Sequence, residues 1–188
     1  IPYEIYIPDR KKEGYGPSIT GIESLIKKKV KLIFTVDCGT LSYQAIDYAN
    51  KNKIDVIVLD HHQSEVKLPK AHSVINPNRI DDKSNLEYLC AAGVTFMFLV
   101  SLNFYLKKKN WFNKNSINEP NLINCLDLVS LGTVCDVVPL IGLNRAIVKQ
   151  GLKILKEKKN LGLKTLIDIC NIKNNFSSYH LGYILGPR

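Results

Sequence analysis

The sequence lacks the features that mark membrane-spanning or secreted proteins. No run of apolar residues reaches the roughly 18 that a transmembrane helix needs. The first residues, Ile-Pro-Tyr-Glu-Ile-Tyr, have neither the basic region nor the apolar core of a signal peptide. The chain also has no internal repeats and no low-complexity segment. We therefore expect a soluble, cytoplasmic protein that makes no membrane contact.

The sequence lacks the cysteine pattern of two kinds of site. The five cysteines are an odd number with no CxxC pair, which argues against a disulfide framework and against a thiolate zinc site. All five lie in or beside apolar sequence, and we expect each to serve as a small buried hydrophobic side chain. They are Cys38, Cys90, Cys125, Cys135 and Cys170.

The composition is that of a globular protein with an excess of positive charge. With 188 residues, 45% hydrophobic and 23% charged, the chain has the length for one domain with a sizeable core or for most of a larger one. The net charge of +9 favours an anionic partner such as nucleic acid. The lysine runs at 27–29, 107–109 and 156–159 are weaker signals, because lysines at helix ends and in loops commonly serve only solvation.

Apolar periodicity divides the chain into an α/β part and a helical part. Strands are predicted over 3–7, 31–36, 55–59 and 73–75, with helices over 18–29 and 42–51 between them. This alternation is typical of a parallel sheet flanked by helices and extends over 1–80. Beyond it, 85–188 is mainly helical, with a core helix over 89–106, a polar loop over 110–119, and helices over 121–131, 144–156 and 163–169.

The apolar strand that ends at Leu59 is followed at once by Asp60, His61 and His62. Only two other histidines exist, His72 and His180, so adjacent histidines at this point stand out. Carboxylate and neutral imidazole together suit Mn, Zn or Fe better than the all-oxygen shell of Ca or Mg. The competing interpretation is a solvated turn with surface histidines.

Two further carboxylates end apolar elements in the same way. Asp37 follows the preceding strand, so Asp37 and Asp60 are expected at the same edge of a parallel sheet, where such sheets bind their ligands. Asp136 lies alone inside the apolar stretch 132–140, where a buried carboxylate needs a cation or several donors. Several carboxylates with imidazole at one edge suit two-metal phosphoryl hydrolysis, with cations about 3.5–4 Å apart.

These motifs carry a resemblance. Asp37 in its Val-Asp-Cys-Gly context, the 60–62 triplet and Asp136 resemble the second to fourth motifs of the DHH phosphoesterase superfamily. The flanking segments are similar to the RecJ family of single-strand-specific 5′→3′ DNA exonucleases, which act in recombination and repair. They are 6–10, 13–16, 75–78, 89–94, 132–140, 144–145 and 185–188. The likeness spans nearly the whole chain.

The resemblance implies roles for the four candidate catalytic residues. Asp37 is expected to bridge two Mn²⁺ or Mg²⁺ ions, with His61 and Asp136 as ligands of one of them. Asp60 is expected to orient a metal-binding residue without binding the metal itself, and His62 is expected to face the scissile phosphate.

Further expectations from the resemblance concern the substrate and its partners. Arg10 and Arg188 are candidates for phosphate contact. The competing interpretation of Arg10 is that it anchors its own loop. The substrate would be single-stranded DNA, with helicases or single-strand-binding proteins as possible cellular partners. Two alternatives stay open: another DHH phosphoesterase, such as an oligonucleotidase or pyrophosphatase, and a catalytically dead nucleic-acid-binding relative.

The sequence departs from the family in two places. A first motif of the Asp-x-Asp type, on a strand before residue 3, does not occur, and neither do the C-terminal domains that follow the Gly-Pro-Arg segment in RecJ-like proteins. We therefore expect residues 1–188 to be a partial DHH catalytic domain that is inactive by itself and holds at most one metal ion well.

Overall fold

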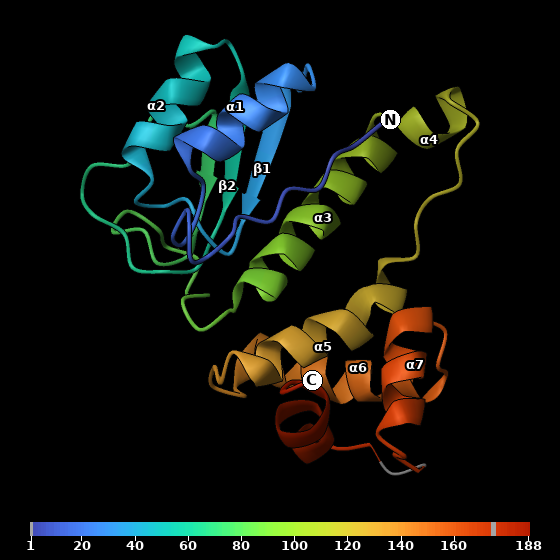
Figure 1. The fold of residues 1–188 in the computed structure, drawn as a ribbon. Helices are drawn as coiled ribbons and strands as arrows, with labels where there is room; N and C mark the ends of the chain where they lie inside the picture. Colours follow the sequence, from blue (N-terminus) through green and yellow to red (C-terminus); the bar gives the residue numbers. More distant parts are fainter. Residues whose placement is uncertain (1, 174–175) are drawn as a thin grey trace. The chain divides into compact units, whose positions relative to one another are not determined.

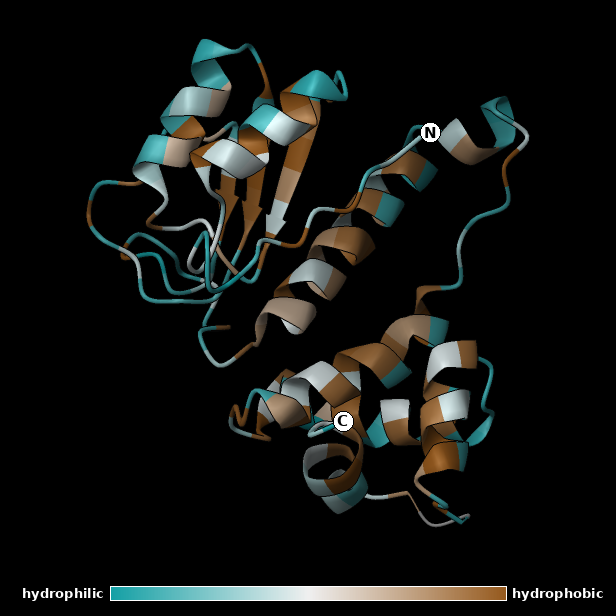
Figure 2. Cartoon of the chain, in the orientation of Figure 1, coloured by the Kyte–Doolittle hydropathy of each residue, from teal (hydrophilic) through white to brown (hydrophobic). Residues whose placement is uncertain are grey.

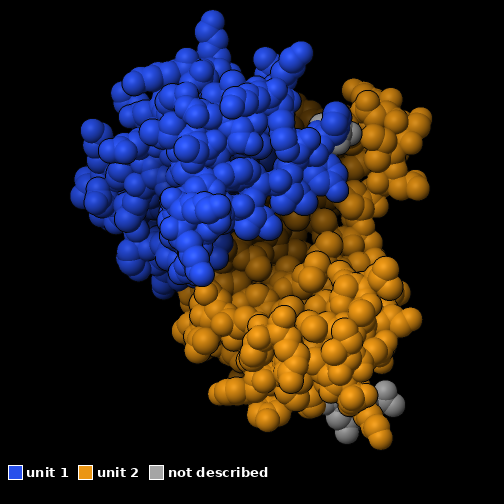
Figure 3. All heavy atoms as spheres, in the orientation of Figure 1, with its two compact units in different colours: residues 1–87 blue, residues 88–188 orange. Residues whose placement is uncertain are grey.

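The computed structural model describes residues 2–173 and 176–188, so Ile1 lies outside the described part. The chain divides into two compact units, Ile1–Glu87 (unit 1) and Tyr88–Arg188 (unit 2), coloured separately in Figure 3. Each unit is described by itself. Among the described residues, no helix combines the length and the apolar character that crossing a membrane requires.

Unit 1 contains a three-stranded parallel sheet in the order β1-β2-β3 (Figure 1). The strands are β1 (Leu32–Val36), β2 (Asp55–Leu59) and β3 (Ser73–Ile75), and the helices are α1 (Ile19–Lys27) and α2 (Tyr43–Lys51). Val36 pairs with Leu59, and Leu59 pairs with Ile75, so the three strands end level with one another. The predicted parallel sheet flanked by helices is confirmed.

The core of unit 1 lies between the sheet and its two helices. Val56 and Val58 alternate along β2 and form one buried cluster with Ile22 of α1 and with Ile46 and Ala49 of α2. The apolar residues of each helix fall on one stripe, which is why both helices pack on the sheet and leave their polar sides in solvent (Figure 2). Ser18 caps α1 by accepting a hydrogen bond from the amide of Gly21.

The strand predicted over 3–7 is wrong. Residues 2–9 have no regular secondary structure, and the alternate side chains of Tyr3, Ile5 and Ile7 are 82%, 73% and 84% exposed. An alternating pattern becomes a strand only when its backbone pairs with a neighbour, and no ladder includes this segment among the described residues. The loop that follows is held by Glu13, which accepts hydrogen bonds from Tyr6 Oη and the amide of Asp9.

Unit 2 is helical, as predicted. Its elements are α3 (Ala91–Lys108), α4 (Trp111–Lys114), the 3₁₀ turn η1 (Leu122–Cys125), α5 (Leu126–Cys135), α6 (Gly142–Lys156), α7 (Leu161–Ile169) and the π-helical η2 (His180–Leu185). The short helix α4 lies inside the predicted polar loop. The helix predicted over 121–131 begins as the 3₁₀ turn and ends four residues later than expected.

Helices α5 and α6 pack closely because one helix carries a glycine at the contact. A Cβ atom added to Gly151 of α6 would overlap Ser130 Oγ and the carbonyl oxygen of Leu126 on α5. The Ser130 hydroxyl turns back to donate to that same Leu126 carbonyl. Close approach of the two backbones therefore depends on the absence of a side chain at this position.

Two expectations about burial are corrected. Helix α3 is buried only at its start, at Ala91, Gly93 and Val94, whereas Phe104 is 68% exposed. A helix that is apolar all round has no polar stripe from which exposure can be predicted. Of the five cysteines only Cys90 is buried; Cys135 is exposed and the other three are intermediate.

Candidate metal centre

The sheet brings the first two sequence motifs together. Asp37 directly follows β1, and His61 and His62 follow Asp60 at the end of β2. Because β1 and β2 are parallel neighbours in register, both motifs emerge at the same edge. The pairing continues one step past the strands, where the amide of Asp37 donates to Leu59 O over 2.9 Å and that of Asp60 donates to Ile75 O over 3.1 Å.

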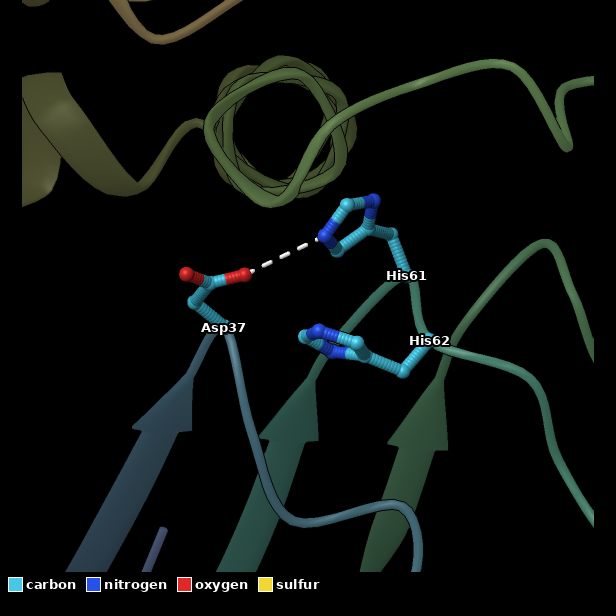
Figure 4. A group of neighbouring side chains, drawn as sticks. All are labelled: Asp37, His61 and His62. Atoms are coloured by element: carbon cyan, nitrogen blue, oxygen red, sulfur yellow. Dashed lines mark ion pairs between the residues drawn. The ribbon is translucent and has the colours of Figure 1, made fainter. Parts of the chain in front are cut away.

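Asp37, His61 and His62 form a compact group of potential metal ligands. One ligand atom from each residue lies within 4.8 Å of the other two. His61 Nε2 is 3.2 Å from Asp37 Oδ1, and the two side chains point toward each other with the His62 ring beside them (Figure 4). The Asp37 side chain is 59% exposed and that of His61 is 14% exposed. One carboxylate and two imidazoles suit a transition-metal cation such as Mn²⁺, and the exposed carboxylate leaves the site open to a ligand from solvent.

A tight turn aims Asp37 at this position. Its backbone is in the left-handed region at φ 62°, and Gly39 follows at φ 113°. A side chain at Gly39 would collide with Thr35 Oγ1 on β1, so only glycine allows the chain to fold back here. The phenol of Tyr15 donates a hydrogen bond to the Asp37 carbonyl oxygen and holds the turn from the other side.

Asp60 is a buried anion that orients His62. Its side chain accepts hydrogen bonds from the amides of Thr40 over 3.0 Å and of His61 over 2.8 Å, and it lies 2.7 Å from His62 Nδ1. Burial acts to raise the pKa of Asp60, but the hydrogen bonds from Thr40, His62 and His61 outweigh it and lower the pKa to about 2. Since an ionised carboxylate only accepts, His62 Nδ1 is the donor in this contact, and Nε2 is the ring nitrogen left to face a ligand.

Arg10 lies close to the same group through an aromatic contact. Its guanidinium carbon is 5.9 Å from the centre of the Tyr15 ring, and that ring meets the His62 ring edge-on at 5.8 Å. Burial raises the pKa of Tyr15 to about 12, together with the negative charges of Asp37 and Asp60. The phenol therefore stays protonated and remains a hydrogen-bond donor at neutral pH.

Comparison with known proteins agrees with these motifs. Residues 2–133 match the DHH family, N-terminal domain. The chain belongs to the DHH family. It is 39% identical over 184 residues to the single-stranded-DNA-specific exonuclease RecJ of Salmonella typhimurium, an alignment that covers 97% of this chain and 32% of the relative. The chain thus spans about a third of the length of this curated relative.

Two solved structures share the fold of this DHH-family chain. A crystal structure of exonuclease RecJ bound to manganese superimposes with a TM-score of 0.77 at 28% identity, covering 97% of this chain and 43% of that one. RecJ from Thermus thermophilus in complex with Mn²⁺ gives a TM-score of 0.70 at 26% identity, covering 90% and 24%. Both of those proteins are bound to Mn²⁺, a cation that suits the mixed carboxylate and imidazole ligands seen here.

The environment of Asp136 differs from the expected one. It caps the C-terminal end of α5 in unit 2, where its amide donates to Gly132 O over 3.0 Å, and its side chain is exposed rather than enclosed in apolar surroundings. The buried face of α5 ends at Thr133, and Val137 beyond it is 87% exposed. The role of Asp136 as a metal ligand stays a prediction from the DHH-family resemblance.

Arg188 also lies in unit 2, just beyond η2. Its guanidinium donates to Ile184 O over 2.7 Å, one turn back along the chain. Phosphate contact by Arg188 stays a prediction. Sequence reasoning assigned no role to Tyr15, although it lies in the segment 13–16 that carries part of the family resemblance.

Proposed function

We propose that this protein is a metal-dependent phosphodiesterase that degrades single-stranded DNA from the 5′ end, as a RecJ-type exonuclease. The observation that carries the proposal is the group of one carboxylate and two imidazoles, with ligand atoms within 4.8 Å, at the C-terminal edge of a parallel sheet. The name of the Salmonella relative and the manganese in the two similar structures support the substrate and the metal.

Asp37 and His61 are the proposed protein ligands of Mn²⁺ or Mg²⁺, and the imidazoles favour Mn²⁺. A bound divalent cation would polarise the phosphodiester and lower the pKa of a water molecule. The protein residues supply position and charge: Asp37 brings an exposed anion on a fixed turn, and Asp60 orients His62, whose Nε2 would face the scissile phosphate. Asp136 is the proposed additional ligand, on the strength of the family resemblance.

Arg10 is the proposed contact for a substrate phosphate beside the metal. Its contact with Tyr15, and that of Tyr15 with His62, keep a guanidinium near the group of ligands. A guanidinium binds phosphate oxygens in a bidentate manner, so Arg10 would orient the strand. Arg188 is a second proposed phosphate contact.

The cellular setting belongs to the same proposal. A RecJ-type exonuclease would act in DNA recombination and repair in the cytoplasm, beside helicases or single-strand-binding proteins that produce or cover its substrate. The net charge of +9 suits a polyanionic substrate and predicts that binding weakens as salt concentration rises.

The proposal is tested by measuring release of nucleotides from end-labelled single strands by the full-length protein with Mn²⁺. Asp37→Ala and His61→Ala are expected to lower kcat at least about 100-fold. His72→Ala is the matched control, because His72 is exposed and lies 3.8 Å from Asp55, away from the group. Normal activity of both site variants would contradict the proposal.

The same assay, run with substrates of different length and end label, distinguishes the proposed function from its alternatives. Preference for long single strands labelled at the 5′ end is expected, with duplex DNA degraded poorly. Efficient hydrolysis of dinucleotides or pyrophosphate, with long strands left intact, would instead identify a different DHH-family hydrolase. Binding of single strands without any hydrolysis would identify a catalytically inactive relative.

A further inference from the structure

The loop after β3 reaches across to the two histidines. Asn76, which is 3% exposed, donates from Nδ2 to His62 O over 2.8 Å and to Thr40 Oγ1 over 2.9 Å. Asn78 donates from Nδ2 to His61 O over 2.6 Å and to Glu87 O over 3.2 Å. Each asparagine of this loop therefore holds the carbonyl oxygen of one histidine.

The amides of the same two histidines are held from the other side. His61 N donates to Asp60 Oδ1 over 2.8 Å, and His62 N donates to the same oxygen over 3.3 Å. The backbone of both residues is thus held at nitrogen and at oxygen, which sets the direction in which each side chain leaves the chain. The asparagine contacts complete this arrangement, since Asp60 holds the two backbone nitrogens and the ring of His62 but neither carbonyl oxygen.

We propose that Asn78 and Asn76 are positioning residues, an asparagine clamp that aims the imidazole of His61 at the metal and that of His62 at the scissile phosphate. The inference rests on the proposed function and adds to it a part of the site that touches neither metal nor substrate. Hydrogen-bonded groups behind the ligands of a metal commonly change its affinity by about 10–100-fold.

Ordinary loop stability does not explain these contacts. Within the loop, Asn76 Oδ1 accepts from the amide of Asn78 over 2.8 Å, which already forms a local turn. Arg79 fastens the loop separately, donating to Val74 O over 2.8 Å and pairing with Asp81 at 2.6 Å. The two Nδ2 groups are the part of the loop that is directed at the histidines.

Because Arg79 and the two asparagines make different contacts, the loop offers a matched control. Asn78→Ala removes the donor to His61, whereas Arg79→Ala loosens the same loop and leaves both donors to the histidines in place. The readout is the Kd for Mn²⁺, measured without DNA from the electron paramagnetic resonance signal of free Mn²⁺ in the full-length protein. Asn78→Ala is expected to raise the Kd about 10-fold or more and Arg79→Ala less than about 3-fold.

A double variant shows whether Asn78 acts through His61. If it does, the double variant Asn78→Ala, His61→Ala has the same Kd for Mn²⁺ as the single variant His61→Ala. If the effects of the two substitutions on the Kd instead add, the clamp is overturned. The ring NMR signals of the two histidines in metal-free protein provide a second readout. The His61 signals are expected to move in Asn78→Ala and the His62 signals in Asn76→Ala, each with little change in the other.

The same titration separates failure of the clamp from failure of the metal site. Wild-type protein should bind Mn²⁺ more tightly than Asp37→Ala. If it does, and Asn78→Ala binds Mn²⁺ as tightly as wild type with unmoved histidine signals, the clamp is wrong and the proposed function stands. Equal Mn²⁺ binding by wild type and Asp37→Ala would overturn both.

Discussion

His61 Nε2 lies 3.2 Å from Asp37 Oδ1, although the two residues follow different strands of the sheet. The parallel register of β1 and β2 produces this distance, because it ends both strands at one level and sends both motifs out of the same edge. The pair is open on one side, since more than half of the Asp37 side chain is exposed. A cation is expected to take the place between the carboxylate and the imidazole.

Asp60→Asn is expected to impair the site strongly. The new NH2 group would face either the amide of Thr40 or that of His61, each of which now donates to its own carboxylate oxygen, and the substitution would remove the charge that sets the His62 tautomer. We expect kcat to fall about 10–100-fold and the free energy of unfolding to fall by about 1–3 kcal/mol. Nuclease assays with thermal melts test both, with Asp55→Asn at an exposed carboxylate as the control. Unchanged kcat would contradict the orienting role of Asp60.

Tyr15→Phe is expected to loosen the turn that carries Asp37. The substitution removes the hydrogen bond to the Asp37 carbonyl and keeps the ring against Arg10 and His62. A lost hydrogen bond of this kind is worth about 1 kcal/mol, so we expect a several-fold rise in the Kd for Mn²⁺ with little change in the KM for DNA. A rise in KM alone would show that Tyr15 acts on the substrate.

Gly151→Ala is expected to destabilise the packing of α5 against α6 in unit 2. The added methyl group would overlap Ser130 and the Leu126 carbonyl, and overpacking of this kind costs about 1–3 kcal/mol. Gly162→Ala is the control: Gly162 is exposed on α7, its Cβ would meet only Asn160 Oδ1 at 3.4 Å, and alanine favours a helix. Chemical denaturation should show opposite signs for the two substitutions.

Glu13 is expected to give the N-terminal loop a stability that depends on pH. Hydrogen bonds from Ser18 and Tyr6, and from the amide of Asp9, lower the pKa of Glu13 to about 2. A carboxyl whose pKa is depressed in the folded state stabilises the fold above its unfolded pKa of about 4.3 and loses that contribution as the pH falls toward 2. The difference in unfolding free energy between wild type and Glu13→Gln should therefore shrink between about pH 5 and pH 2. A difference independent of pH would contradict the prediction.

The sequence predicted the common edge of two motifs, because a local pattern decides it. Asp37 and the 60–62 triplet each follow a short apolar strand, and the single helix between those two strands favours a parallel arrangement, so their common edge followed from the order of the elements. Tyr15 and the asparagine clamp had no such signal. Their contacts depend on how loops fold back onto the sheet, which periodicity does not report.

The wrong predictions also arose where contacts between distant parts of the chain, and not local pattern, decide the structure. Residues 3–7 have the alternation of a strand but no paired neighbour in the described part of the chain. Helix α3 is apolar all round, so its exposed C-terminal half was not predictable from periodicity. Asp136 was placed in apolar surroundings because its neighbours in sequence are apolar, whereas the helix ends before it and leaves the carboxylate exposed.

The most direct test of the central claim is anomalous diffraction at the manganese edge from crystals of the full-length protein soaked in Mn²⁺. A peak within about 2.0–2.4 Å of an Asp37 carboxylate oxygen and of His61 Nε2 is the predicted result. Ordered Mn²⁺ bound elsewhere, with Asp37 and His61 still in contact with each other and no peak between them, would contradict it.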